Sequence, residues 1–239
     1  MRIIAHRGAS AYEPENTLRS FERAVAQGAD WIELDVRLTA DGHPVVLHSS
    51  DLAATTDGRG LVEETSLAAL RLLDAGAGER VPTLDEVLEH FARRCGLYVE
   101  LKAPGAPYAL ALALRRHSSV PALVTCSFDT DLVREAVALL PGVPSAWLSG
   151  HTGIDLAPEA LQAGASLVHL CWQSEGTRPD RLVTKELLEH YPRAGLGVVL
   201  WHEERPAVLA ALLRLPVWGV CTNTPDVAVR LRAVGRSDS

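Results

Sequence analysis

The sequence has few of the features that mark membrane, redox and nucleic-acid-binding proteins. No apolar run approaches the roughly 20 residues that a membrane span requires. None of the four cysteines belongs to a C-x-x-C pair, so zinc and redox motifs lack support. Lysine occurs only at Lys102 and Lys185, and no basic run accompanies the formal net charge of −7. These absences argue against stable membrane insertion and a nucleic-acid partner, and a cytoplasmic enzyme is the default expectation.

The residues that are present predict an α/β fold. The length of 239 residues suits one α/β barrel domain or two small domains, and a content of 47% hydrophobic and 22% charged residues is an ordinary globular balance. Short β-branched runs alternate with amphipathic stretches. We predict a TIM-like (β/α)8 barrel over residues 1–235, with a β-hairpin (37–47) and a loop-rich insertion (49–80) after the second strand. Residues 236–239 are expected to form a frayed tail. An open doubly wound sheet is the competing architecture, although no G-x-G-x-x-G follows the first strand.

The individual elements follow from the spacing of the apolar residues. The expected barrel strands lie at 3–5, 31–35, 97–101, 123–126, 145–148, 166–170, 197–201 and 217–221. The expected helices begin near 18, with Asn16 or Thr17 as the cap, and at 83–93, 108–117, 131–140, 158–163, 180–190, 205–213 and 226–233. The helix at 83 opens on a capping box, in which Thr83 is followed three residues later by Glu86.

The expected strand at 31–35 carries two carboxylates where a barrel strand should be apolar on both faces. Glu33 and Asp35 are two residues apart, so they project to the same side of the strand. Two carboxylates that point into a barrel mouth resist ionisation unless a cation neutralises them, and hard cations prefer oxygen ligands. The plainer interpretation is a half-solvated edge strand of alternating polarity.

The same spacing recurs at the end of the expected strand at 97–101. Glu100 and Lys102 share one face of this strand. A third carboxylate and an ammonium group at the carboxyl end of a strand fit a metal and phosphate site. A simple Glu–Lys pair is the alternative.

Two histidines end strand-like runs. His6 ends the first strand, and His48 follows the apolar run at 45–47. An imidazole suits proton transfer near neutral pH, and the guanidinium of Arg7 matches a phosphate. A lone histidine is more often structural than catalytic, but two of them could serve as acid and base on opposite sides of a phosphorus. Weaker candidates at expected strand ends are His169, His202 and Trp201.

Taken together, these motifs resemble those of the glycerophosphodiester phosphodiesterase family. The matching segments are His-Arg-Gly at 6–8, Pro-Glu-Asn-Thr at 14–17, Ile-Glu-Leu-Asp-Val at 32–36, Val-Val-Leu-His at 45–48, Glu-Leu-Lys at 100–102, Ser-Phe at 127–128 and Cys-Thr-Asn-Thr-Pro-Asp at 221–226. The resemblance spans nearly the whole chain, although the middle, at about 130–195, carries no such motif.

The resemblance implies metal-dependent hydrolysis of a small glycerophosphodiester to an alcohol and sn-glycerol 3-phosphate. The implied acid–base pair is His6 and His48, the implied ligands of one divalent cation, Mg²⁺ or Ca²⁺, are Glu33, Asp35 and Glu100, and the implied substrate- or phosphate-binding residues are Arg7, Glu15, Lys102 and Trp201. Sequence does not assign the acid and the base, nor decide whether water or a glycerol hydroxyl attacks. It leaves a homo-oligomer open.

Two single positions and one short segment depart from the family's pattern. Ser49 and Ala54 stand where the family usually has Asp and Arg, and these changes favour a non-catalytic phosphate-binding barrel as one alternative. A lysophospholipase D or sphingomyelinase D-like phosphodiesterase is another. At 201–204 the chain has Trp-His-Glu-Glu instead of Trp-Thr-Val-Asn, which predicts an acidic rim near the substrate's alcohol.

Overall fold

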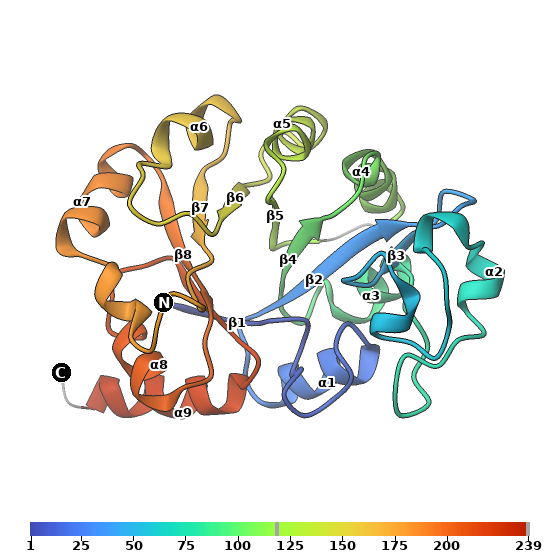
Figure 1. The fold of residues 1–239 in the computed structure, drawn as a ribbon, viewed down its shortest axis with the longest axis horizontal. Coiled ribbons are helices and arrows are strands. Elements are labelled where there is room, and N and C mark those ends of the chain that lie inside the picture. The colour runs from blue at the N-terminus through green and yellow to red at the C-terminus, as the bar shows by residue number, and fades with distance from the viewer. Residues whose placement is uncertain (118–119, 238–239) are drawn as a thin grey trace.

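A sheet of parallel strands closes on itself, because β1 pairs with β2 on one side and with β9 on the other. The computed structural model describes residues 1–117 and 120–237, in which helices surround this barrel (Figure 1). Around the barrel the strands are β1 (Arg2–Ala5), β2 (Trp31–Leu38), β4 (Gly96–Leu101), β5 (Leu123–Ser127), β6 (Ser145–Ser149), β7 (Leu167–Leu170), β8 (Gly197–His202) and β9 (Gly219–Thr222). The predicted TIM-like barrel is confirmed, and the open doubly wound sheet is wrong.

Helices follow the strands and cover the outside of the barrel (Figure 1). They are α1 (Leu18–Ala26), α3 (Leu84–Phe91), α4 (Ala106–Arg116), α5 (Thr130–Leu139), α6 (Ala157–Gln162), α7 (Lys185–Arg193), α8 (Pro206–Leu212) and α9 (Pro225–Ser237). Thr17 caps α1 by accepting a hydrogen bond from the Ser20 amide, and the predicted capping box of α3 is present. Within the expected tail, helix α9 runs to Ser237, and 238–239 lie outside the described residues.

One predicted helix is divided in two. The segment expected to be helical at 180–190 forms a short 3₁₀ turn, η3 (Pro179–Leu182), and then α7. Thr184 separates them, because its extended backbone lets its side chain accept a hydrogen bond from the Leu187 amide. A strong N-cap inside an amphipathic pattern therefore begins a new helix.

The predicted hairpin and insertion follow β2. Strand β3 (Pro44–Val46) pairs antiparallel with the end of β2, which extends β2 beyond its expected bound. The insertion contains η1 (Leu52–Ala54), η2 (Val62–Glu64) and α2 (Leu67–Leu70) and projects to the right in Figure 1. It has its own buried cluster, formed by Val45, Leu47, Leu52, Val62, Leu70, Ala75 and Val81. This packed arm fixes the backbone that leads into His48.

The two faces of β2 meet different surroundings. Ile32, Leu34 and Val36 are fully buried in the cluster that includes α1, α3 and α4. Glu33 and Asp35 project to the opposite side, into the barrel. Because the strands are parallel, their carboxyl ends meet at one face, where side chains from several strands converge. None of the helices within residues 1–117 and 120–237 is long and apolar enough to span a lipid bilayer.

Candidate active site

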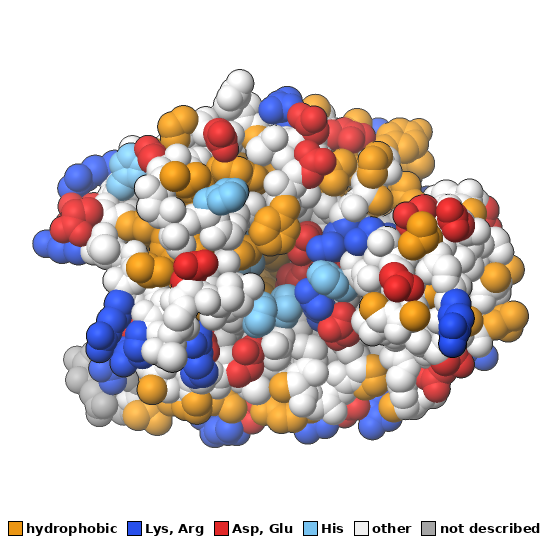
Figure 2. Space-filling view, in the orientation of Figure 1, with side chains coloured by type: hydrophobic (Ala, Val, Ile, Leu, Met, Phe, Trp, Pro, Cys, Tyr) orange, Lys and Arg blue, Asp and Glu red, His pale blue; other side chains and the backbone are white. Residues whose placement is uncertain are grey.

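A pocket of about 210 Å³ opens where the carboxyl ends of the strands meet. Figure 2 shows a hollow in this face, with acidic side chains at its base and histidines beside it. The residues that line the pocket are His6, Arg7, Glu33, His48, Tyr98, Glu100, Lys102, Cys126, Phe128, Leu148, His169, Cys171, Gln173, Trp201, His202 and Cys221. Its walls come from both ends of the sequence, so only the closed barrel assembles it.

Three carboxylates meet in this pocket's floor. Asp35 of β2 lies directly beside Glu100 of β4 in the sheet, and Glu33 lies one pleat earlier on β2. One oxygen from each of the three lies within 4.8 Å of the others, and the three side chains are buried. The two-residue spacing predicted which side of its strand each acid faces, and the family resemblance implied that the three acids lie together.

The charge of this cluster is not balanced by its surroundings. Burial and the neighbouring carboxylates Asp35 and Glu100 raise the pKa of Glu33 well above its usual range. Burial and Asp35 raise the pKa of Glu100 to about 7. Asp35 Oδ1 is buried and makes no directed hydrogen bond within the described part of the chain. Three such oxygens, one of them an unsatisfied acceptor, fit a hard divalent cation.

Two cationic side chains stand against the carboxylates. Lys102 Nζ lies 2.5 Å from Glu100 Oε1 and 3.3 Å from Asp35 Oδ1. Arg7 Nε lies 3.3 Å from Asp35 Oδ2, and Arg7 Nη1 donates to both oxygens of Glu15 at 3.1 Å. Burial would raise the pKa of Asp35, but Lys102 and Arg7 lower it overall. Glu15 thus contacts Arg7, and its part in the site is to hold the guanidinium.

The turn after β1 has a demanding backbone geometry. Arg7 adopts a φ of 54° and Gly8 a φ of 84°, both in the left-handed region. A Cβ on Gly8 would lie 2.0 Å from Ser20 Oγ and 2.7 Å from the Ser20 carbonyl carbon, so α1 leaves no space for a larger residue. This turn aims the Arg7 amide at Glu33 Oε2, which accepts its hydrogen bond at 2.8 Å. The His-Arg-Gly motif therefore builds the site through its backbone as well as its side chains.

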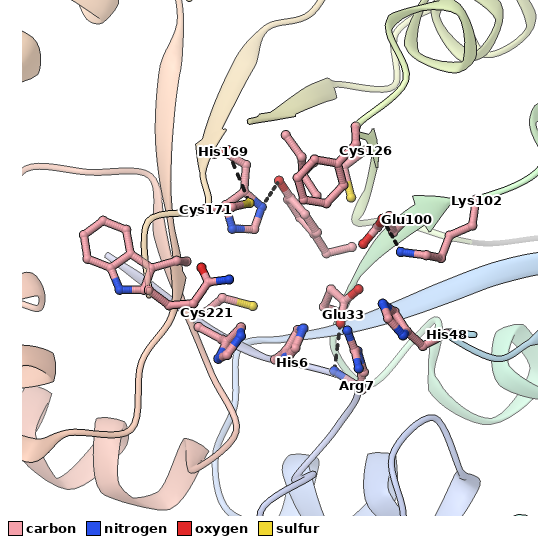
Figure 3. Close-up of a pocket in the computed structure, with 16 residues that line it drawn as sticks. His6, Arg7, Glu33, His48, Glu100, Lys102, Cys126, His169, Cys171 and Cys221 are labelled. Atoms are coloured by element: carbon pink, nitrogen blue, oxygen red, sulfur yellow. Dashed lines mark hydrogen bonds and ion pairs between the residues drawn. The ribbon is translucent and has the colours of Figure 1, made fainter. Parts of the chain in front are cut away.

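The two predicted histidines flank this charged centre. In Figure 3 the side chains of Arg7 and Glu33 lie between His6 and His48. His6 Nδ1 lies 2.7 Å from Asn223 Oδ1, at the end of β9. Burial lowers the pKa of His6 well below its usual range, and the positive charge of Arg7 lowers it further. Burial, only partly opposed by Asp35, lowers the pKa of His48 to about 4. Both imidazoles are therefore neutral near pH 7 and can accept a proton.

The two departures near His48 have local roles. Ser49 Oγ accepts a hydrogen bond from the Asp51 amide at 3.1 Å. The Asp51 carboxylate accepts one from the Ala53 amide at 3.0 Å and so caps η1 rather than supporting His48. Ala54 is exposed in η1. The carbonyl of His48 instead accepts a hydrogen bond from Arg37 Nε at 2.8 Å, so the backbone of His48 is fixed from β2.

The prediction of an acidic rim beyond Trp201 is wrong for Glu203, one of the two carboxylates concerned. Glu203 is 2% exposed, and its oxygens accept hydrogen bonds from the Arg205 guanidinium at 2.6 and 2.7 Å. Trp201 lines the pocket but is 1% exposed, with its Nε1 3.4 Å from Glu203 Oε2 and its ring stacked on Trp172. The buried Glu203 carboxylate is therefore paired with the partly exposed Arg205 side chain. Glu204 remains partly exposed.

The other weaker candidates also lie in the pocket wall. His169 is 5% exposed, and its Nδ1 lies 3.3 Å from the Tyr98 hydroxyl (Figure 3). Burial lowers the pKa of His169 to about 3, with a smaller contribution from the neighbouring His202. His202 lines the pocket beside His6. Sequence reasoning assigned no role to Asn223 or Arg37. The closed barrel brings Asn223 to His6, whereas the hairpin of β2 and β3 brings Arg37 to the backbone of His48.

Replacing Glu33 by glutamine is expected to stabilise the metal-free protein by about 1–2 kcal/mol while removing a candidate metal ligand. The substitution removes a buried carboxyl group whose ionisation the two neighbouring carboxylates oppose, and it keeps an oxygen that accepts from the Arg7 amide. Thermal unfolding in chelator should show a Tm higher by about 2–8 °C. With excess Mg²⁺ the order should reverse, since the wild type gains binding energy that the variant lacks. A lower Tm for the variant in chelator would contradict the charge argument.

Comparisons with known proteins agree with this geometry. The model of the glycerophosphoryl diester phosphodiesterase family matches residues 6–227. Glycerophosphodiester phosphodiesterases from Bacillus subtilis and Caldanaerobacter subterraneus subsp. tengcongensis are 32% and 31% identical to this chain. The first alignment covers 94% of this chain and 84% of that protein, and the second covers 96% of each.

A solved structure shows the same fold. A phosphodiesterase from Oleispira antarctica, in complex with the product sn-glycerol-3-phosphate, superposes with a TM-score of 0.88. The two chains are 28% identical, and the superposition covers 100% of this chain and 97% of the other.

Proposed function

Because this chain belongs to the glycerophosphoryl diester phosphodiesterase family, we propose that its pocket hydrolyses a small glycerophosphodiester to an alcohol and sn-glycerol 3-phosphate. The observation that carries the proposal is the buried cluster of Glu33, Asp35 and Glu100, which contacts Arg7 and Lys102 in the pocket that His6 and His48 also line. Acid–base groups on both flanks of an anion site suit the displacement of an alcohol from phosphorus.

The substrate's phosphoryl group is proposed to bind between Arg7 and Lys102. Both side chains face the pocket, and both are held by carboxylates, so they are oriented before the substrate arrives. The guanidinium can form two parallel hydrogen bonds to phosphoryl oxygens, while the ammonium adds a point charge. Fixed positive groups of this kind stabilise the charge that builds on the oxygens in the transition state.

Glu33, Asp35 and Glu100 are proposed to hold one divalent cation. Mg²⁺ and Ca²⁺ both prefer carboxylate oxygens, so the ligand set admits either ion. When bound, such an ion would neutralise charge on the phosphoryl oxygens. The carboxylates themselves contribute by lying close to Lys102 and Arg7, so they keep these cations at the edge of the anion site.

The two histidines are proposed to move the protons. Asn223 Oδ1 holds the Nδ1 side of His6, which leaves Nε2 free for the substrate. One imidazole takes a proton from the attacking hydroxyl, which belongs either to water or to the substrate's own glycerol. In the second case a cyclic phosphate forms first, and water must then open it to give sn-glycerol 3-phosphate. The other imidazole, charged beside the anionic phosphate, delivers a proton to the leaving alcohol.

Assays on matched substrates test this function. We expect kcat/KM for glycerophosphocholine to exceed that for lysophosphatidylcholine by at least about 10-fold, because a pocket of about 210 Å³ leaves little space for an acyl chain. A preference for the lysolipid would instead support a lysophospholipase D-like enzyme. Tight metal binding without hydrolysis of any glycerophosphodiester would support a non-catalytic phosphate-binding barrel.

A further inference from the structure

The carboxyl end of β8 contains a β-bulge that redirects two side chains. Leu200 pairs with Val220 on β9, and the next pair joins His202 to Cys221. Trp201 is therefore an extra residue that has no partner of its own in the β8–β9 register. Regular alternation would send Trp201 and His202 to opposite faces of the strand. With the bulge, both side chains line the pocket, together with Cys221.

The redirected imidazole stacks on a proposed catalytic imidazole. The rings of His202 and His6 are nearly parallel, at 9°, with centroids 4.5 Å apart. Such a face contact restricts rotation of the His6 ring about its Cβ–Cγ bond.

A chain of polar contacts also links His202 to the edge of the His6 imidazole. His202 Nδ1 lies 3.5 Å from Glu204 Oε1, which accepts a hydrogen bond from the Asn223 amide at 3.0 Å. The side-chain oxygen of Asn223 in turn lies 2.7 Å from His6 Nδ1. These contacts form a closed circuit through His6, His202, Glu204 and Asn223. The His6 imidazole is therefore held on its face by His202 and on its edge by Asn223.

We propose that His202 is a positioning residue for His6, delivered to the pocket by the bulge in β8 and completed by Glu204. The inference rests on the proposed acid–base role of His6. Trp201 occupies the bulge position but has its ring packed on Trp172, so it leaves the face of His6 to His202. His202 acts through His6 and not on the substrate directly.

The test compares variants of the full chain, assayed with glycerophosphocholine and saturating Mg²⁺. His202→Ala should lower kcat roughly 10-fold and change KM less than about 2-fold, because a loosened His6 misses its reactive geometry. His202→Phe keeps an aromatic face and should recover most of kcat. His202→Gln keeps the size and polarity without the stack and should behave like His202→Ala. The exposed His151, in the loop after β6, provides the matched control His151→Ala, which should leave kcat unchanged.

A double-mutant cycle separates positioning from a general structural role. In the His6→Ala background, His202→Ala should leave the residual kcat unchanged, because the group that it positions is gone. An equal further loss in that background would overturn the inference, as would a full kcat for His202→Ala or an effect confined to KM. If the wild type hydrolyses no glycerophosphodiester, the proposed function fails first. Normal wild-type turnover with an unaffected His202→Ala variant rejects this inference alone.

Discussion

Replacing either His6 or His48 by alanine is expected to lower kcat by at least about 10²-fold while the barrel stays folded. Each histidine lies at the pocket and is neutral near pH 7, and Figure 3 places them on either side of Arg7 and Glu33. Because one proton must leave the nucleophile and another must reach the leaving alcohol, the loss of either imidazole should slow the chemical step. KM should change much less than kcat, since Arg7 and Lys102 still bind the phosphate.

The histidine variants need steady-state kinetics together with a check of folding by circular dichroism. His43→Ala is a suitable control, because His43 is exposed at the tip of the hairpin, on the same arm as His48. This control should keep wild-type kcat. Near-normal turnover in both His6→Ala and His48→Ala would refute the acid–base assignment.

Chelation is expected to lower activity by at least about 10²-fold, and Mg²⁺ or Ca²⁺ should restore it. The physical reason is the buried cluster of three carboxylates, which two cationic side chains do not fully neutralise. The same ions should raise Tm, because a ligand at 100 times its Kd stabilises the folded state by about 2.7 kcal/mol. Asp35→Asn should remain inactive at ion concentrations that restore the wild type, since it removes the central carboxylate.

The control for the metal experiment is Asp131→Asn, which removes an exposed carboxylate on α5 that pairs with Arg134. This variant should lose activity in chelator and regain it with Mg²⁺ as the wild type does. Full wild-type activity in excess chelator would remove the metal role of Glu33, Asp35 and Glu100. An Asp35→Asn variant with normal metal-dependent activity would contradict the proposed ligand set.

Much of the fold follows from local sequence pattern. Each predicted strand overlaps an observed one, because buried parallel strands are short β-branched runs that periodicity marks well. Element bounds are less predictable where capping or pairing decides them. Thr184 begins α7 inside a continuous amphipathic stretch, and pairing with β3 lengthens β2.

The chemistry of the site was partly predictable for the same reason. Glu33, Asp35 and Glu100 break the apolar rule of barrel strands, so their two-residue spacing marks the side that faces the pocket. The contacts that orient this chemistry join distant segments. Asn223 reaches His6 across 217 positions, and no local pattern in the sequence connects them.

Strand register near the site is hard to predict from the sequence. Alternation predicts whether a side chain faces the barrel only while the strand stays regular, and one bulge changes the direction of every residue beyond it. The family resemblance gave Trp201 a substrate-binding role, His202 stayed a weaker candidate, and the departure at 201–204 suggested that Glu203 lies at the rim. The structure instead places His202 against His6 and buries Glu203 against Arg205.

A crystal structure of the protein with Mn²⁺ and sn-glycerol 3-phosphate would test the central arrangement most directly. We predict one Mn²⁺ ion, identified by its anomalous scattering, bound to oxygens of Glu33, Asp35 and Glu100. The phosphorus should lie between the imidazoles of His6 and His48. Manganese bound elsewhere with these acids unligated, or a phosphate away from both histidines, would contradict it.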